Sequence, residues 1–126
     1  MLGWIFGATK QNIVHLNEPD KAAGYLELEK ARIRWFLSLD HNDLPEQAVQ
    51  TGLRSFRSIV IDGKEVEYSD GFTELHTLSY KEILAGRGFG LNEARQSVQI
   101  AYIIRNSKLS GLTGDYHPYL KRLKNV

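Results

Sequence analysis

The sequence contains no cysteine, and this absence excludes whole classes of chemistry. Without thiols there are no disulfides, thiolate zinc sites, iron–sulfur clusters or cysteine nucleophiles. There is also no apolar run near the roughly 20 residues that a membrane helix needs. The apolar start of the chain is too short for a secretory signal peptide and has no basic leader. We therefore expect a cytoplasmic protein that does not act at a membrane.

An excess of one charge is lacking too. The 126 residues include 16 basic and 15 acidic side chains, which leaves a net charge of +1. A nucleic-acid-binding surface would concentrate lysine and arginine on one face, so no nucleic-acid partner is expected. A small basic cluster near the end, Lys121, Arg122 and Lys124, is typical of a solvated tail. The remaining composition is 42% hydrophobic and 25% charged, as in an ordinary globular domain.

The chain opens on a short helical pattern. Leu2, Ile5 and Phe6 have helical spacing, and Gly7 is a typical helix end. No capping residue precedes them, so we expect the last turns of a helix whose beginning is missing. After Gly7 the apolar period changes to two, which indicates strands. Strands are expected over residues 11–17, 22–28, 31–39, 54–61 and 64–68, the last two joined by an Asp62-Gly63 hairpin turn.

Helices dominate the second half. A short helix is expected after Pro45, to about residue 50. Two longer helices follow. The first is expected from 69–71 to about 85, and its apolar stripe is Phe72, Leu75, Tyr80, Ile83 and Leu84. The second is expected over residues 92–106, and its buried face is Leu91, Ala94, Val98, Ala101 and Ile104. This order predicts an α+β fold, a mostly antiparallel open sheet with helices on one face. We expect one domain over 1–108 and a tail, 109–126, that packs on the domain or on a partner.

The strand expected over 31–39 has two different faces. Alternate residues point the same way, so one face carries Ala31, Ile33, Trp35, Leu37 and Leu39. The other face carries Arg32, Arg34, Phe36, Ser38 and Asp40. This second face is too apolar for plain exposure to solvent. We therefore expect a homo-oligomer that forms through this sheet face, most simply a twofold dimer.

Two arginines on that face are candidates for ligand binding. Arg32 and Arg34 lie two residues apart, and guanidinium groups match the paired oxygens of diphosphates and carboxylates. The same side chains could instead form ion pairs with Glu27 or Glu29 across the hairpin. Both interpretations stay open, and Arg34 is kept as a candidate substrate-binding residue.

The start of the 69–85 helix supplies the other candidates. His76 lies four residues after Phe72 and four before Tyr80, on the apolar side of the helix. It is either a hydrogen-bonded histidine of the core or an interface, or a polar group in a substrate cleft. Asp70 can cap the helix, or it can lie with Thr73 beside a bound anion. Asp70, Thr73 and His76 are therefore candidate substrate-binding residues.

The residues predict no reaction. The four histidines lack metal-ligand spacing, and there is no His-Glu-x-x-His pattern. The glycine-rich segment at residues 86–90 links two predicted helices, whereas a dinucleotide-binding loop follows a strand. No strained nucleophile turn and no carboxylate pair is present. No catalytic, metal-binding or cofactor-binding residue is therefore assigned to the chain.

Several stretches, in the same order, resemble bacterial UDP-N-acetyl-2-amino-2-deoxyglucuronate dehydrogenases, which belong to the Gfo/Idh/MocA oxidoreductases. They are residues 4–7, 11–15, 18–28, 31–39, 69–77, 88–91 and 104–106. The resemblance implies a C-terminal domain whose large open sheet serves substrate binding and oligomerisation. Such enzymes oxidise the 3-hydroxyl of a UDP-linked uronic acid with NAD, on the route to lipopolysaccharide O-antigen sugars. The family's NAD fingerprint, its catalytic lysine and its His/Asp pair would all precede Met1.

The resemblance therefore implies a truncated oxidoreductase domain that binds no NAD itself. We expect the substrate-binding and oligomerisation domain of an NAD-dependent, UDP-N-acetylglucosaminuronate-type 3-dehydrogenase, inactive alone and with a UDP-sugar as its ligand. The alternative is a stand-alone, self-associating binding module that modulates full-length relatives.

Overall fold

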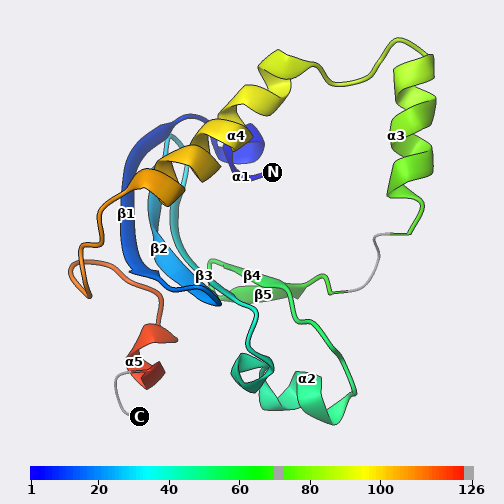
Figure 1. Ribbon diagram of the computed structural model, residues 1–126. Coiled ribbons are helices and arrows are strands. Elements are labelled where there is room, and N and C mark those ends of the chain that lie inside the picture. The colour runs from blue at the N-terminus through cyan, green and yellow to red at the C-terminus, as the bar shows by residue number, and fades with distance from the viewer. Residues whose placement is uncertain (70–72, 124–126) are drawn as a thin grey trace. The chain divides into compact units, whose positions relative to one another are not determined.

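The computed structural model describes residues 1–69 and 73–123. They belong to two compact units, which are treated separately below. The first unit combines Met1–Leu39 with Phe89–Val126, and the second is Asp40–Gly88. Figure 1 shows the elements of both.

A three-stranded antiparallel sheet is the centre of the first unit (Figure 1). Its strands are β1 (Thr9–Asn17), β2 (Lys21–Leu28) and β3 (Arg32–Ser38), in the order β1-β2-β3. The short helix α1 (Leu2–Phe6) precedes them and ends at Gly7, whose φ of 88° favours glycine. These elements and the antiparallel α+β class confirm the sequence prediction.

Two extra residues interrupt the pairing of β1 with β2. The register shifts between Thr9 and Gln11 and again between Val14 and Leu16, so Lys10 and His15 are the inserted residues. Such bulges bend a strand and redirect side chains. The alternation expected from the sequence therefore does not hold along the whole of β1.

Cross-strand register assigns the remaining side chains to two faces. Asn12, Leu26 and Ile33 are neighbours on one face, which we call the helix face. The opposite face carries the two residue rows Ile13-Tyr25-Arg34 and Leu16-Ala23-Phe36. We call it the strap face, because the C-terminal segment crosses it. Buried apolar residues on β1 and β2 make up most of the core of this unit; they are Val14, Ala23, Tyr25, Leu26 and Leu28, joined by Leu120.

Helix α4 (Leu91–Asn106) packs on α1 and β1. The prediction of its buried face was wrong except at Ile104. Leu91, Ala94, Val98 and Ala101 are exposed, whereas Gln96, Ile100, Ile103 and Ile104 are half-buried. Apolar residues occur on two adjacent stripes of this helix, and the periodicity does not decide between them. Gln96 decides it, because its side chain donates a hydrogen bond to the carbonyl oxygen of Gly7.

The end of β3 also differs from the prediction. Ile33 and Trp35 are half-buried, but Leu37 is 66% exposed and Leu39 is 87% exposed. Phe36, on the supposedly open face, is half-buried instead. The segment after α4 explains the burial of Phe36, because it crosses the strap face and ends in a short helix, α5 (Leu120–Leu123), that the sequence did not predict.

The second unit is a set of short elements. They are η1 (His41–Asp43), α2 (Glu46–Gln50), β4 (Ser58–Ile61), β5 (Lys64–Glu67) and α3 (Leu75–Leu84). β4 and β5 form a separate two-stranded antiparallel sheet, so the five predicted strands form two sheets. Residues 54–57 lie outside β4, and the backbone N–H of Arg57 is bonded to the Ser69 hydroxyl.

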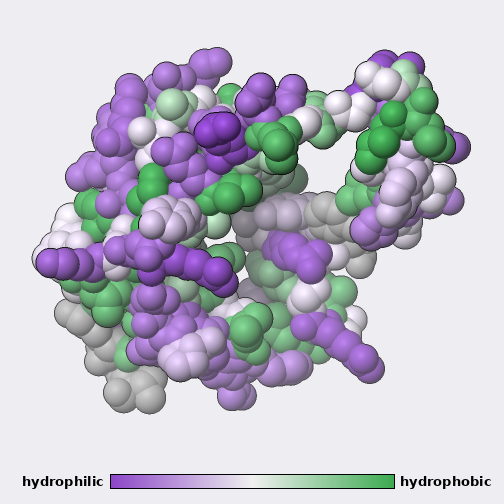
Figure 2. Space-filling model, turned by 45° about the horizontal axis from the view of Figure 1, so that its top comes forward, coloured by the Kyte–Doolittle hydropathy of each residue, from purple (hydrophilic) through white to green (hydrophobic). Residues whose placement is uncertain are grey.

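Helix α3 begins later than predicted. It starts at Leu75, after Glu74 in the left-handed region at φ 62°. Asp70 and Phe72, which were expected in or beside its first turn, lie outside the described residues. Leu75, Leu78, Tyr80, Ile83 and Leu84 are all exposed within this chain. Figure 2 shows the apolar surface of α3 as green areas. Among the described residues, no helix is long and apolar enough to cross a membrane.

Gly24 is the position where the sheet tolerates a side chain least. A Cβ there would meet the carbonyl oxygen of Ile13 and would lie 2.6 Å from the Trp35 ring. We predict that Gly24→Ala lowers the free energy of unfolding by about 1–3 kcal/mol, because the core must shift to admit the methyl group. Urea denaturation followed by circular dichroism measures the change. Ala101→Val, on the exposed side of α4, is the control and should change stability by less than about 0.5 kcal/mol.

Candidate functional site

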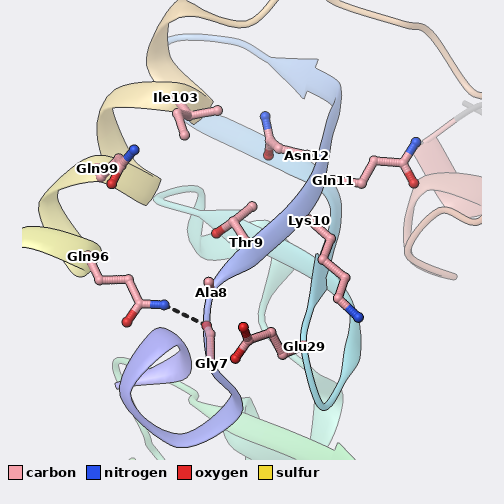
Figure 3. A pocket seen from close by; sticks show the side chains of 10 residues that line it. All are labelled: Gly7, Ala8, Thr9, Lys10, Gln11, Asn12, Glu29, Gln96, Gln99 and Ile103. Atoms are coloured by element: carbon pink, nitrogen blue, oxygen red, sulfur yellow. Dashed lines mark hydrogen bonds between the residues drawn. The ribbon is translucent and has the colours of Figure 1, made fainter.

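A pocket of about 620 Å³ lies between α4 and the start of β1 in the first unit. Figure 3 shows Gln96 pointing from α4 to Gly7, with Gln99 and Ile103 further along the same helix and Thr9 and Asn12 on the facing strand β1. The side chains of Lys10 and Gln11 point away from α4 in this view, so they lie at the rim. The walls are therefore built mainly from amides, one hydroxyl and one isoleucine.

The end of α1 forms the floor of the pocket. Gly7 turns the chain from the helix into β1, and the Glu29 carboxyl group lies against it. A Cβ at Gly7 would clash with Glu29, and its φ of 88° is unfavourable for other residues. Glycine at this position thus allows both the turn and the close approach of a carboxylate.

Hydrogen bonds hold the two walls together. The Nδ2 of Asn12 donates to the Ser107 hydroxyl at 2.8 Å, and that hydroxyl donates to the carbonyl oxygen of Ile103 at 2.7 Å. Within the described residues, the Oδ1 of Asn12 is buried and has no hydrogen-bond partner. Leaving a buried acceptor unpaired costs free energy, so Asn12 at this position lowers the stability of the unit.

Amides, a hydroxyl and a carboxylate can donate and accept hydrogen bonds at neutral pH without changing charge. Such a set suits recognition of a hydroxyl-rich or amide-bearing ligand. The residues that the model describes contain no group of three potential metal ligands among His, Asp and Glu. The geometry supports binding, and it gives no basis for a chemical step.

The predicted site residues fall in both units. Arg34 lies on β3 in the first unit, where its Nη1 is 3.4 Å from Oδ1 of Asp115. The partner is thus an aspartate of the C-terminal segment, whereas Glu27 or Glu29 was considered from the sequence. Thr73 and His76 belong to the second unit, where both are exposed. Asp70 lies outside the described residues. The structure describes no single site that contains the four candidates, and their substrate role stays a prediction.

Sequence reasoning missed the pocket residues, although a signal was present. Asn12 falls on the same face as Leu26 and Ile33, at a position where a core-facing strand carries apolar residues. Gln96 and Gln99 repeat at a spacing of three, on one side of α4. Polar side chains at inward positions of both elements indicate a polar site between them.

No protein-family model matches the chain. Two solved structures of the WlbA (WbpB) dehydrogenase from Thermus thermophilus do match. The complex with NAD and alpha-ketoglutarate is 48% identical, with a TM-score of 0.88. The complex with NAD and UDP-GlcNAcA is 46% identical, with a TM-score of 0.87. This chain is homologous to the C-terminal domain of that dehydrogenase. The resemblance seen in the sequence is thereby confirmed.

The match spans nearly the whole of this chain but only part of the dehydrogenase chain. It covers 94% of this chain and 38% of the dehydrogenase chain in each case. The dehydrogenase thus has a long additional portion with no counterpart here. Ligands named for the whole dehydrogenase therefore need not all touch the part that this chain represents.

The glycine-rich segment at residues 86–90 does not have the structure of a dinucleotide-binding loop. Gly86, Gly88 and Gly90 lie in the connection from α3 to α4, and no strand precedes them directly. Gly86 has a φ of 73° after the end of α3, and the backbone N–H of Gly90 donates to the Glu93 carboxylate at the start of α4. These glycines end one helix and begin the next, as predicted. A carboxylate at the helix start would also repel a pyrophosphate.

Ser107 connects α4 to β1, so it should hold the pocket walls together. We predict that Ser107→Ala lowers the free energy of unfolding by about 1–3 kcal/mol, because the buried Asn12 amide loses its acceptor. Thermal unfolding followed by circular dichroism measures this. Ser97→Ala, on the exposed side of the same helix, is the matched control. Equal stability of both variants would contradict this account of the pocket.

Proposed function

We propose that this chain forms the substrate side of an NAD-dependent UDP-sugar 3-dehydrogenase of the UDP-N-acetylglucosaminuronate type, in lipopolysaccharide O-antigen biosynthesis. The observation that carries the proposal is the 46% identity, over 94% of the chain, to a dehydrogenase solved with NAD and UDP-GlcNAcA. On this proposal NAD is bound by the portion of the dehydrogenase that has no counterpart here. The chain alone is inactive as an oxidoreductase.

The pocket between α4 and β1 supports a role in binding the sugar. Thr9, Gln99 and Glu29 supply a hydroxyl, an amide and a carboxylate around it. An N-acetylated sugar presents hydroxyl and amide groups that such side chains can pair with. Arg34, Asp70, Thr73 and His76 remain proposed contacts of the substrate. Arg34 lies on the opposite face of the sheet from this pocket, so it is an alternative anion contact that suits a diphosphate if it exchanges Asp115 for the ligand.

Saturation-transfer NMR on the chain alone tests this proposal. We expect UDP-GlcNAcA to receive saturation and NAD to receive none. Gln99→Ala should weaken sugar-nucleotide binding about fivefold, because one hydrogen bond to a neutral group contributes about 1 kcal/mol. Ser97→Ala is the control on the same helix and should bind as the parent does. Saturation of NAD, or none of UDP-GlcNAcA, would contradict the proposal.

A second candidate function is that of a stand-alone, self-associating module that modulates full-length relatives. The observation that favours it is the exposure of Leu37 and Leu39 at the end of β3. The outer edge of β3 has no partner strand among the described residues of the sheet, and such edges can pair with a second copy. As expected from the sequence, this candidate is a homo-oligomer that forms through the sheet. Its contact is at the edge of β3 and not on the sheet face, because residues of the C-terminal segment already contact Phe36 on that face.

Sedimentation velocity at micromolar concentration separates this candidate from a monomeric domain. We predict a dimer that Leu37→Asp converts to a monomer, since a charge at the contact costs several kcal/mol to bury. Leu84→Asp, in the second unit, should leave the dimer intact. A monomeric parent, or a dimer that only Leu84→Asp dissociates, would refute association through β3.

A further inference from the structure

Residues 113–123, which we call the strap, cross the strap face of the sheet. The approach begins at the edge of β1, where Leu109 bridges Val14 and the N–H of Ser110 donates to the carbonyl oxygen of Val14 at 2.9 Å. Figure 1 shows the chain leaving α4, passing beside β1 and ending in α5. The strap thus starts at one edge strand and reaches the other.

The first strap contact is with β1. His15, the inserted residue of the second bulge, is only 5% exposed. Its Nε2 lies 3.0 Å from the carbonyl oxygen of Thr113, and its ring meets Tyr116 edge-on at 6.1 Å between centroids. The bulge therefore aims a histidine at the strap.

The second set of contacts is with β3. Asp115 pairs with Arg34, and the ring of His117 stacks on Phe36 with 5.8 Å between centroids. Tyr119 packs on the same phenylalanine at 4.5 Å. Between the two edge strands, Ala23 and Tyr25 of β2 are buried, as is Leu120 of the strap. The strap is thus a cover for one face of the core.

One hydrogen bond inside the strap depends on the protonation state of a side chain. The backbone N–H of Tyr119 donates to Nδ1 of His117 at 3.2 Å, so the turn that places both rings on Phe36 requires Nδ1 to be unprotonated. The charged groups around His117 are Arg34 from β3 and Asp115 and Arg122 from the strap, with Arg122 lying over the Tyr119 ring. Asp115 is already paired with Arg34, so a second positive charge at His117 gains little from it.

Two glycines near the start of the strap can act as backbone hinges. Gly111 and Gly114 have φ values of 63° and 69°, and no atom outside their chain neighbours lies within 4 Å of a Cβ built on either. Gly111 precedes the strap, and Gly114 directly follows Thr113, the first strap residue that contacts the sheet. Backbone of this kind can change direction without displacing packed side chains.

We propose that the strap is a pH-sensitive cover, docked on the sheet while His117 is neutral and released when His117 gains a proton. Protonation of Nδ1 breaks the His117–Tyr119 hydrogen bond within the strap and places a cation beside Arg34, and release of the strap then exposes the aromatic surface of Phe36. The sheet face that the sequence marks as an interaction surface then becomes accessible. The proposal does not depend on the proposed dehydrogenase function.

The direction of the pH dependence follows from linkage. Burial, and after it the positive charge of Arg34, lower the pKa of His117 below its ordinary value of 6.5 in the docked strap. In a released strap this pKa returns to the ordinary value, so the released strap binds more protons below that pH. Docking is therefore strongest above pH 6.5 and weakens as the pH falls through the lowered pKa.

Hydrogen–deuterium exchange of the whole chain, read by mass spectrometry, tests the proposal. Exchange is compared at about pH 8 and about pH 5, the range in which histidine titrates, and corrected with a synthetic peptide of residues 113–123. We expect the protection of the strap to fall at least about threefold at the lower pH, while β2 stays protected. Equal strap protection at both pH values, or simultaneous loss from β2, would overturn the proposal.

Variants assign the effect to one histidine. His117→Phe keeps a ring on Phe36 and cannot be protonated, so its strap protection should not change with pH. His117→Asn keeps an acceptor near Nδ1 and should behave the same way if the phenylalanine variant does not fold. His41→Gln, in the second unit, should keep the parent's fall. A fall that survives both His117 variants, or that disappears only in His15→Phe, would refute the role of His117.

Discussion

The contact between the Trp35 indole and the bare backbone of Gly24 is the constraint on which the first unit depends. Gly24 is in the middle of β2, the central strand, and pairs with β1 and β3 at once. Without a Cβ, its backbone admits the indole, which fills the helix face beside Val14 and Leu26. Because this row is filled, α4 needs to cover only the β1 side of the helix face. The strap covers the opposite face of the sheet. The pocket and the strap contacts thus rest on one closely packed strand.

Much of this architecture could be predicted from local pattern. Period-two alternation located β1, β2 and β3, and the glycine after Phe6 located the end of α1. The helical periodicity over residues 92–106 predicted the bounds of α4 to within one residue. The prediction failed where tertiary contacts decide. The predicted stripe of α4 is mostly exposed, and the face that packs on the unit includes Gln96, which bonds to the carbonyl oxygen of Gly7. The bulge at His15 and the strap depend on side chains about a hundred residues apart, which local periodicity does not detect.

In the candidate site, too, some features could be predicted from local pattern and others depend on tertiary contacts. Arg34 was selected because guanidinium pairs suit anions, and it does pair with a carboxylate, but that carboxylate belongs to the strap. Thr73 and His76 were selected from a helix pattern whose first turn is not helical. The pocket residues were missed because neutral amides such as those of Asn12 and Gln96 match no catalytic or metal-binding motif. Homology to the WlbA (WbpB) dehydrogenase adds what local chemistry lacks, a ligand class to test at the polar pocket.

The exposed apolar side chains have a consistent explanation if the chain functions within a larger dehydrogenase. Helix α3 and the β4–β5 hairpin are too small to be stable through their own burial, and both expose large apolar residues.

The most direct test of the central claim is a crystal structure of this chain soaked with UDP-GlcNAcA and NAD. The account predicts density for the sugar against Thr9, Gln99 and Glu29, and none for NAD. A nucleotide bound at the connection from α3 to α4, with the pocket empty, would contradict it.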